Sequence, residues 1–204
     1  MREEFIKSIN LHQNAFRVRL SGATIARLAD YYELVQQHNP ILHLVGPCSP
    51  EEFATRHILE SLTLLKRLPQ GAKFADVGAG AGLPSIPCLI ARDDLSAVLI
   101  ESKEKKTGFL QSVIAECKLA DRTTIVNSQF SETKRPDVSF VTCRALDRFT
   151  QKLPQLLKWS GYCTLLFFGG PSLGEEFQRL GIRPERKLMP FSEQRFLFIV
   201  KRSK

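Results

Sequence analysis

Three glycines alternate with alanines in one short segment, and this spacing is the feature of the chain most suggestive of chemistry. The segment Gly78-Ala79-Gly80-Ala81-Gly82 follows an apolar stretch that contains Asp76 and ends at Val77. Glycines at such positions permit a tight turn and allow a ligand to approach the backbone closely. We therefore expect a ligand-binding loop between a buried strand and the helix that follows it.

The spacing of these glycines indicates which ligand the loop would bind. A loop for a nicotinamide dinucleotide reads G-x-G-x-x-G and places a pyrophosphate at the start of the next helix. Here the third glycine, Gly82, comes one residue early, and Leu83 occupies the position of the dinucleotide glycine. S-adenosylmethionine has no phosphate, so it does not need that arrangement. The spacing favours S-adenosylmethionine as the cofactor and disfavours a dehydrogenase.

A carboxylate at the end of the next apolar run supports an adenosine-containing ligand. Glu101 follows the run Ala97–Ile100, about 20 residues after the glycines, where an acid can accept hydrogen bonds from both ribose hydroxyls. A lone acid at a strand end is usually structural, but the acid and the glycine loop at this distance are together much more specific.

Asp76 has two interpretations that the sequence leaves open. It could cap the loop by accepting hydrogen bonds from backbone N–H groups, or it could orient the amino end of the cofactor, directly or through water.

The elements that would position these residues alternate between strand and helix from Lys73 onward. A basic helical segment follows Glu101 over residues 103–118, and another helix includes Pro154–Trp159. The expected strands cover residues 74–77, 97–100, 123–126, 138–142, 162–168 and 196–200. This alternation predicts an α/β fold with a doubly wound, mostly parallel Rossmann-like sheet. We expect a methyltransferase domain over residues 71–204 and a helical N-terminal extension over residues 1–70.

Two helix signals stand out in the extension. Apolar residues recur at spacings of three and four from Ile25 to Val35, and Asn39-Pro40 then breaks the pattern. Ser49-Pro50-Glu51-Glu52 is a helix start, with a serine cap, a proline in the first turn and acids near the positive end of the helix dipole. We expect this helix to end near Leu68–Gly71.

Composition limits the class of protein. No apolar run is long enough to cross a bilayer and no secretory signal is present, so we expect a cytoplasmic protein that does not contact membranes. The chain has 29 Lys and Arg against 21 Asp and Glu, a formal charge of +8 that would attract a polyanion such as RNA. None of the five cysteines forms a C-x-x-C pair, and all four histidines precede the glycine loop. We therefore expect buried free thiols and no metal site.

At this point the chain resembles a known family, the bacterial 16S rRNA guanine-N7 methyltransferases called RsmG or GidB. The resemblance rests on Arg56-His57-Ile58-Leu59-Glu60-Ser61-Leu62, on the run from Asp76 through Gly82-Leu83-Pro84-Ser85-Ile86-Pro87, and on Cys143-Arg144-Ala145. It covers the chain from about Tyr31 to the C-terminus, and the glycine run with its Leu-Pro-x-Ile-Pro continuation is far more specific than a generic methyltransferase loop.

The resemblance implies methyl transfer from S-adenosylmethionine to N7 of a guanine in 16S rRNA, either free or in the small ribosomal subunit. It implies that Gly78 and Leu83 line the cofactor site and that the segment around Phe130 and Ser131 borders the adenine. Arg144 matches an arginine that the family places beside the cofactor after the fourth strand. With Asp76, Gly80, Gly82 and Glu101, these residues form the expected cofactor site. We expect the protein to act as a monomer.

One departure from the family concerns the substrate. Relatives usually end the fifth strand with a lysine-glycine pair, and this chain has Phe168-Gly169 there. Phe168 could stack on a base or could belong to the core, which is the more common role of a phenylalanine at the end of a buried strand.

The expected reaction needs little acid-base chemistry. Guanine N7 is unprotonated at neutral pH and already nucleophilic, so the enzyme must mainly position it, and we assign Arg144 to orienting substrate or cofactor. Basic residues could contact RNA phosphates without reading sequence. These are Lys103, Lys105, Lys106, Lys134, Arg135, Arg148, Lys152, Arg183, Arg186, Lys187 and Arg195. Two alternatives stay open: a methyltransferase of the same fold for another RNA or a small molecule, and a non-catalytic RNA-binding relative.

Overall fold

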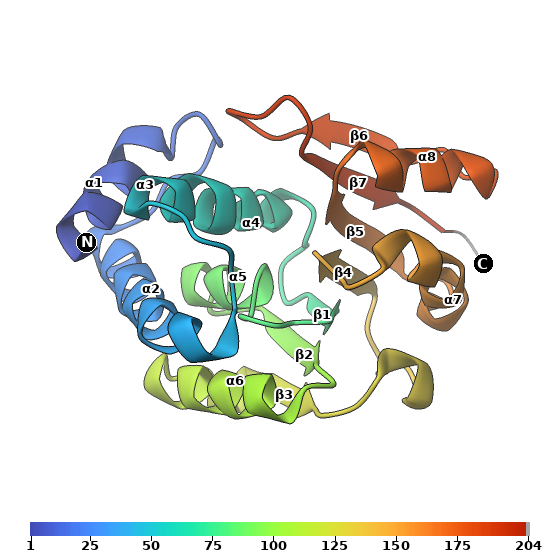
Figure 1. The fold of residues 1–204 in the computed structure, drawn as a ribbon, viewed down its shortest axis with the longest axis horizontal. Coiled ribbons are helices and arrows are strands. Elements are labelled where there is room, and N and C mark those ends of the chain that lie inside the picture. Colours follow the sequence, from blue (N-terminus) through green and yellow to red (C-terminus); the bar gives the residue numbers. More distant parts are fainter. Residues whose placement is uncertain (203–204) are drawn as a thin grey trace.

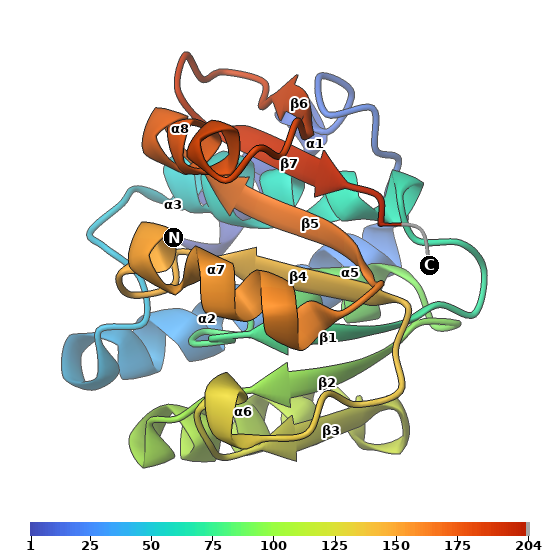
Figure 2. The same cartoon turned by 90° about the vertical axis from the view of Figure 1, so that its right-hand side faces the viewer.

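A seven-stranded sheet runs through the computed structural model, which describes residues 1–202. Its strand order is β3-β2-β1-β4-β5-β7-β6, and Figure 2 shows this order from the bottom of the view to the top. The strands are β1 (Lys73–Val77), β2 (Ser96–Ile100), β3 (Thr123–Val126), β4 (Phe140–Arg144), β5 (Thr164–Gly169), β6 (Glu185–Leu188) and β7 (Phe196–Val200).

The pairing confirms a mostly parallel, doubly wound sheet. The five strands from β1 to β5 pair in parallel, and only β7 runs antiparallel to both β5 and β6. Strand β1 lies between β2 and β4. Strands β2 and β3 lie on one side of it, and β4 and the later strands lie on the other, so the strand order reverses at β1. In such sheets ligands bind at the carboxyl ends of the strands, at the point where the strand order reverses.

Helices cover both faces of the sheet (Figure 1). Helices α5 (Ser85–Ala91) and α6 (Glu104–Glu116) pack on one face, and α7 (Phe149–Ser160) and α8 (Pro171–Arg179) pack on the other. Two short turns, η3 (Ala120–Arg122) and η4 (Phe130–Glu132), flank β3.

The N-terminal region is helical, as predicted. It consists of α1 (Arg2–His12), α2 (Gly22–Leu42) and a continuous helical stretch over residues 50–66. That stretch comprises α3 (Pro50–Glu52), η1 (Phe53–Leu59), α4 (Glu60–Leu62) and η2 (Thr63–Lys66). Its start is the predicted one: Ser49 Oγ accepts from the backbone N–H of Glu52 at 3.1 Å, and the Glu52 carboxylate accepts from the Ser49 N–H at 3.1 Å.

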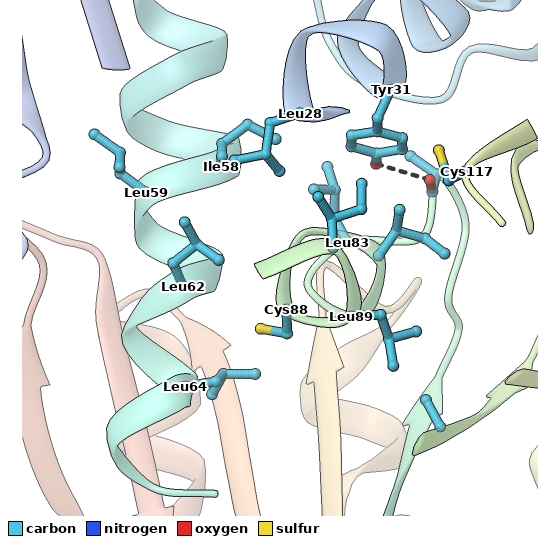
Figure 3. Close-up of a cluster of buried hydrophobic side chains, with 14 of the residues drawn as sticks. Leu28, Tyr31, Ile58, Leu59, Leu62, Leu64, Leu83, Cys88, Leu89 and Cys117 are labelled. Atoms are coloured by element: carbon cyan, nitrogen blue, oxygen red, sulfur yellow. Dashed lines mark hydrogen bonds between the residues drawn. The ribbon is translucent and has the colours of Figure 1, made fainter. Parts of the chain in front are cut away.

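One continuous hydrophobic core joins these helices to the α5 and α6 face of the sheet. Its buried side chains come from α1 and α2, from residues 50–66, and from the sheet with α5 and α6. In Figure 3 Leu28 of α2 and Ile58 of η1 point toward each other, above Leu83 and Cys88. A second cluster lies between the sheet and helices α7 and α8.

Several element boundaries differ from the sequence prediction. Helix α2 continues through Pro40 to Leu42, because a proline so near the end of a helix disrupts only its last turn. Strand β4 lies two residues later than predicted, so Arg144 is its last residue. The pattern gave no indication of α8 or of β6, a mostly polar edge strand paired on one side only.

No helix among residues 1–202 is long and apolar enough to cross a bilayer. All five cysteines are free thiols, as predicted; four are buried and Cys48 is half-buried. Within the same residues no group of three or more His, Cys, Asp or Glu side chains is placed to hold a metal ion.

Candidate functional site

A cavity of about 400 Å³ opens where the carboxyl ends of β1, β2 and β4 meet. This volume lies within the usual range for small-molecule sites. Of the predicted site residues, six line the cavity: Gly78, Gly80, Leu83, Glu101, Phe130 and Arg144. Asp76, Gly82 and Ser131 do not line it. We call it the first cavity.

The glycine loop follows β1 and turns sharply toward α5. The N–H groups of Gly78 and Ala79 both donate to the Ile100 carbonyl, at 2.8 and 3.1 Å, which fixes the loop to the end of β2. Gly78 and Gly82 have φ of +73° and +89°, a backbone conformation that glycine adopts without strain. A side chain at Gly82 would overlap that of Ile86, so this glycine allows α5 to pack closely, and its contact with a cofactor stays a prediction.

Glu101 connects two segments of the cavity wall. Its carboxylate accepts from the N–H of Gly80 at 2.9 Å and, through the other oxygen, from the N–H of Lys103 at 2.8 Å. The residue is only 6% exposed. A carboxylate has about four acceptor sites, so each oxygen keeps one for a ligand. The ribose role that the sequence predicts therefore remains available, and the bond that holds the glycine loop is an additional function.

Asp76 is fully buried in β1 and does not line the first cavity. One oxygen, Oδ2, accepts from Ser85 Oγ at 2.5 Å, and Oδ1 has no partner. Burial raises the pKa of this carboxyl to about 7, although the Ser85 hydrogen bond opposes the shift. The bond to Ser85 holds the start of α5 against the strand, and a contact between Asp76 and a cofactor stays a prediction.

Phe130 and its neighbours form the wall of the cavity beyond β3. Phe130 is buried and packs edge-to-face on Trp159, with ring centres 5.9 Å apart. Ser131 is exposed and does not line the cavity, whereas Ser128 and Gln129 do. The segment lines the first cavity through residues 128–130, and its contact with an adenine stays a prediction.

Arg144 is held by groups from the N-terminal helices. Its Nη2 donates to the Arg56 carbonyl at 2.6 Å and to the Glu60 carboxylate at 3.1 Å. Its Cζ lies 5.3 Å from the ring centre of Phe168, in cation–π contact. Its Nη1 is buried without a partner. Phe168 is 5% exposed, so it belongs to the core and also supports the arginine.

Glu60 is a residue of the site that the sequence pattern did not indicate. Glu60 is 1% exposed, and besides Arg144 it accepts a hydrogen bond from Arg195 Nε at 2.7 Å. An acid inside the apolar run of residues 58–62 was the available signal, because a buried charge requires partners.

His57 and Tyr31 were missed as well. His57 lines the first cavity, and burial together with nearby arginines lowers its pKa to about 3, so the ring is neutral at pH 7. Its Nδ1 has no partner. Tyr31 of α2 donates through its hydroxyl to the Ala81 carbonyl at 2.9 Å, which ties the glycine loop to the N-terminal helices (Figure 3).

Three of the eleven basic residues predicted to contact RNA line the first cavity, and two others are bonded within the fold. Lys103, Lys106 and Lys152 line the first cavity and can meet an anionic ligand there. Arg195 is paired with Glu60, and Arg135 donates to the Val138 carbonyl at 3.2 Å. These two arginines therefore have structural partners.

Comparisons with known proteins agree with this architecture. The model of a family described as rRNA small subunit methyltransferase G matches residues 24–181. A ribosomal RNA small subunit methyltransferase G from Sorangium cellulosum is 35% identical over 147 residues, which are 69% of this chain and 61% of that protein. One from Nitrosospira multiformis is 33% identical over 169 residues, 82% of this chain and 76% of that protein. The match to the Sorangium protein thus spans less than two thirds of its length.

Solved structures match in fold. A SAM-dependent methyltransferase from Aquifex aeolicus superposes with a TM-score of 0.58 at 15% identity, over 83% of this chain and 97% of that one. The sheet described above is therefore a Rossmann-like methyltransferase sheet.

Proposed function

The chain belongs to the rRNA small subunit methyltransferase G family, and on that premise we propose that it transfers a methyl group from S-adenosylmethionine to N7 of a guanine in 16S rRNA. The observation that carries the proposal is the joined pair of Gly80 and Glu101 at the carboxyl ends of β1 and β2. The pair gives one cavity both a backbone that a ligand can approach and a carboxylate with free acceptor sites.

The residues of the first cavity fit the cofactor. A Cβ at Gly80 would meet only the Gly78 carbonyl within 4 Å, at 3.7 Å, so the backbone there borders open space. Glu101 would accept from the ribose hydroxyls, and Phe130 would pack against the adenine. Gly78 and Leu83 would border the rest. S-adenosylmethionine, bound there, supplies a methyl group on a sulfonium, a good electrophile.

The protein's own groups would position the base and would not need to remove a proton. Guanine N7 carries a free lone pair at neutral pH. His57, with its pKa of about 3, adds no charge to the cavity, and Asp76 is buried outside it. Alignment of nucleophile and electrophile can supply much of the rate enhancement of such a transfer. Arg144, which lines the first cavity, would orient the substrate.

The RNA substrate would be bound in part by basic residues at the first cavity. Lys103, Lys106 and Lys152 would contact phosphates at the cavity opening, as expected of a chain with a formal charge of +8. We infer that the protein works as a monomer in the cytoplasm, on small ribosomal subunits or their rRNA.

Methyl transfer to small subunits tests the proposal directly. The protein is incubated with labelled S-adenosylmethionine and subunits from a strain that lacks the modification, and aniline cleavage then locates N7-methylguanine. We expect label on 16S rRNA at one guanine. Label on tRNA would indicate another RNA substrate, and the absence of both transfer and cofactor binding in calorimetry would indicate a non-catalytic relative.

A further inference from the structure

A second cavity, of about 340 Å³, adjoins the first at the ends of β4 and β5. The two cavities share Arg144, Ala145 and Leu146, the residues that follow from the end of β4. The second cavity extends from there to the start of α8, where Gly170 and Ser172 line it. A ligand in it would therefore lie directly beside the cofactor site.

Its walls are apolar and aromatic over most of their extent. Phe149, Phe168 and Phe196 line it together with Leu173. Phe149 and Phe196 are half-buried, which leaves part of each ring accessible. Enzymes that modify bases hold the flipped base in a pocket of this kind, between aromatic and apolar side chains.

Charged groups are confined to one cluster of three residues, Glu60, Arg144 and Arg195. The Glu60 carboxylate accepts one hydrogen bond on each oxygen, from Arg144 and from Arg195, and so keeps about two acceptor sites. Arg144 keeps a buried donor, Nη1, that no group of the described chain satisfies. A ligand here would meet acceptors and a donor side by side.

We infer that the second cavity is the subsite for the target base and that it selects guanine. Glu60 accepts from the N1–H and the N2 amino group, and Arg144 Nη1 donates to O6. The inference rests on the proposed function and names the residues that read its substrate.

The order of groups around guanine matches the order of groups in the protein. Along the edge of the base come the N2 amino group, N1–H, O6 and then N7. Along the protein come Glu60, which lines only the second cavity, then Arg144, which lines both, and then the first cavity. A guanine read in this way turns N7 toward the cofactor site. Adenine has an acceptor at N1, which would face the Glu60 carboxylate and leave it unpaired.

A variant that fills the second cavity provides the first test. Gly170 has φ of −92°, and a Cβ there makes only ordinary contact, 3.6 Å from the Gln194 carbonyl. Gly170→Leu should retain the affinity for S-adenosylhomocysteine in calorimetry and lose methyl transfer to small subunits by about a hundredfold or more. The control is Gly22→Leu, at an exposed position with nothing within 4 Å of its Cβ. Transfer by Gly170→Leu at the Gly22→Leu rate would overturn the inference.

Mononucleotides test base recognition without ribosomal RNA. GMP, IMP and CMP are titrated at millimolar concentration into protein saturated with S-adenosylhomocysteine, and the labelled methyl groups of Leu146 and Leu173 report binding by NMR. IMP lacks the N2 amino group, so we expect it to bind about tenfold more weakly than GMP. Glu60→Gln should abolish this preference, an effect that a merely structural role of Glu60 would not produce.

The two tests separate this inference from the proposed function. Binding of CMP as strong as that of GMP, or no shift with any nucleotide, overturns the inference even if the wild type methylates rRNA. If the wild type methylates no RNA, the proposed function is wrong, while preferential GMP binding would still support the second cavity as a guanine site.

Discussion

Three buried carboxylates at the site lie in three different environments, and each environment suits a different task. Glu101 accepts from two backbone N–H groups and faces the first cavity. Glu60 is bound by two arginines. Asp76 has one hydroxyl donor and no cation in contact, and its pKa is raised to about 7 by burial. Glu101 and Glu60 each accept a hydrogen bond on both carboxylate oxygens, whereas Asp76, with its pKa of about 7, is protonated in a large fraction of molecules at neutral pH.

At Gly80 an added carboxylate should abolish cofactor binding. The N–H of Gly80 is bonded to Glu101, so the side chain of Gly80→Asp would place a second negative charge in the wall of the cavity and reduce its open space. We expect the affinity for S-adenosylhomocysteine to fall at least about a hundredfold, or ~2.7 kcal/mol, in calorimetry. Gly71→Asp is the control, since Gly71 has a similar φ of +68° and open surroundings. Equal affinities of the two variants would remove the loop from the cofactor site.

At Asp76 the raised pKa makes stability depend on pH. The folded state holds the proton up to a pH of about 7, while the unfolded carboxyl loses it near 3.8. Wild-type stability is therefore highest below the lower value and falls as pH rises to the higher one. Asparagine has no proton to lose, so the stability of Asp76→Asn does not fall over this range. Its free energy of unfolding, relative to that of the wild type, should therefore rise by on the order of 4 kcal/mol between the two pH values. Urea denaturation at several pH values without cofactor measures it, and a difference that does not vary with pH would contradict the assigned environment.

Among the elements, α2 connects the N-terminal helices to the glycine loop. The connection is the bond from the Tyr31 hydroxyl to the Ala81 carbonyl, made between residues 50 positions apart in the chain. Around it, Leu28 and Leu83 belong to the same hydrophobic core (Figure 3). The helices thus fix the conformation of a loop that is otherwise supported mainly by β2.

Removal of the Tyr31 hydroxyl should weaken this connection. In Tyr31→Phe the buried Ala81 carbonyl loses its partner, and we expect unfolding to become easier by about 1–3 kcal/mol. Tyr32→Phe is the control, because the neighbouring hydroxyl makes no hydrogen bond within residues 1–202. Denaturant unfolding of both variants, with and without S-adenosylhomocysteine, measures the cost. If the two variants were equally stable, the bond would contribute nothing.

The elements also show which features the sequence could predict. The glycine loop, β1, β2 and the Ser49 helix start have local signals, because their spacing or apolar pattern lies within a few residues. Strand β6 has no local signal, because it is a mostly polar edge strand that pairs only with β7. The cluster of Glu60, Arg144 and Arg195 could not be predicted from the sequence for a different reason. Its partners lie 84 and 135 residues away, and only the folded sheet brings them together.

At the scale of the whole molecule, both ends of the chain contribute to one site. Arg195 precedes β7, Glu60 lies in the N-terminal helices, and Arg144 ends β4 between them. We propose that the two parts of the chain, divided at residue 71, have different roles. The C-terminal part would carry the cofactor loop, and the N-terminal helices would hold that loop in place and supply Glu60, the carboxylate that reads the base. A helical extension used in this way would be essential to methyl transfer.

We expect the positive charge of the molecule to act on RNA through particular lysines that contact phosphates. Lys152 lines the first cavity, whereas Lys158 lies exposed near the end of the same helix. Replacement of either by alanine lowers the net charge equally, so a difference between them isolates a local phosphate contact from long-range attraction. We expect Lys152→Ala to bind small-subunit RNA more weakly and to reduce the slope of log affinity against log salt concentration by about 0.7–0.9. Lys158→Ala should leave that slope unchanged, and it should not change the affinity for S-adenosylhomocysteine. Filter binding over a range of salt concentrations measures the slope. Equal slopes for the two variants would mean that RNA is attracted by the overall charge and that the opening of the first cavity makes no phosphate contact at Lys152.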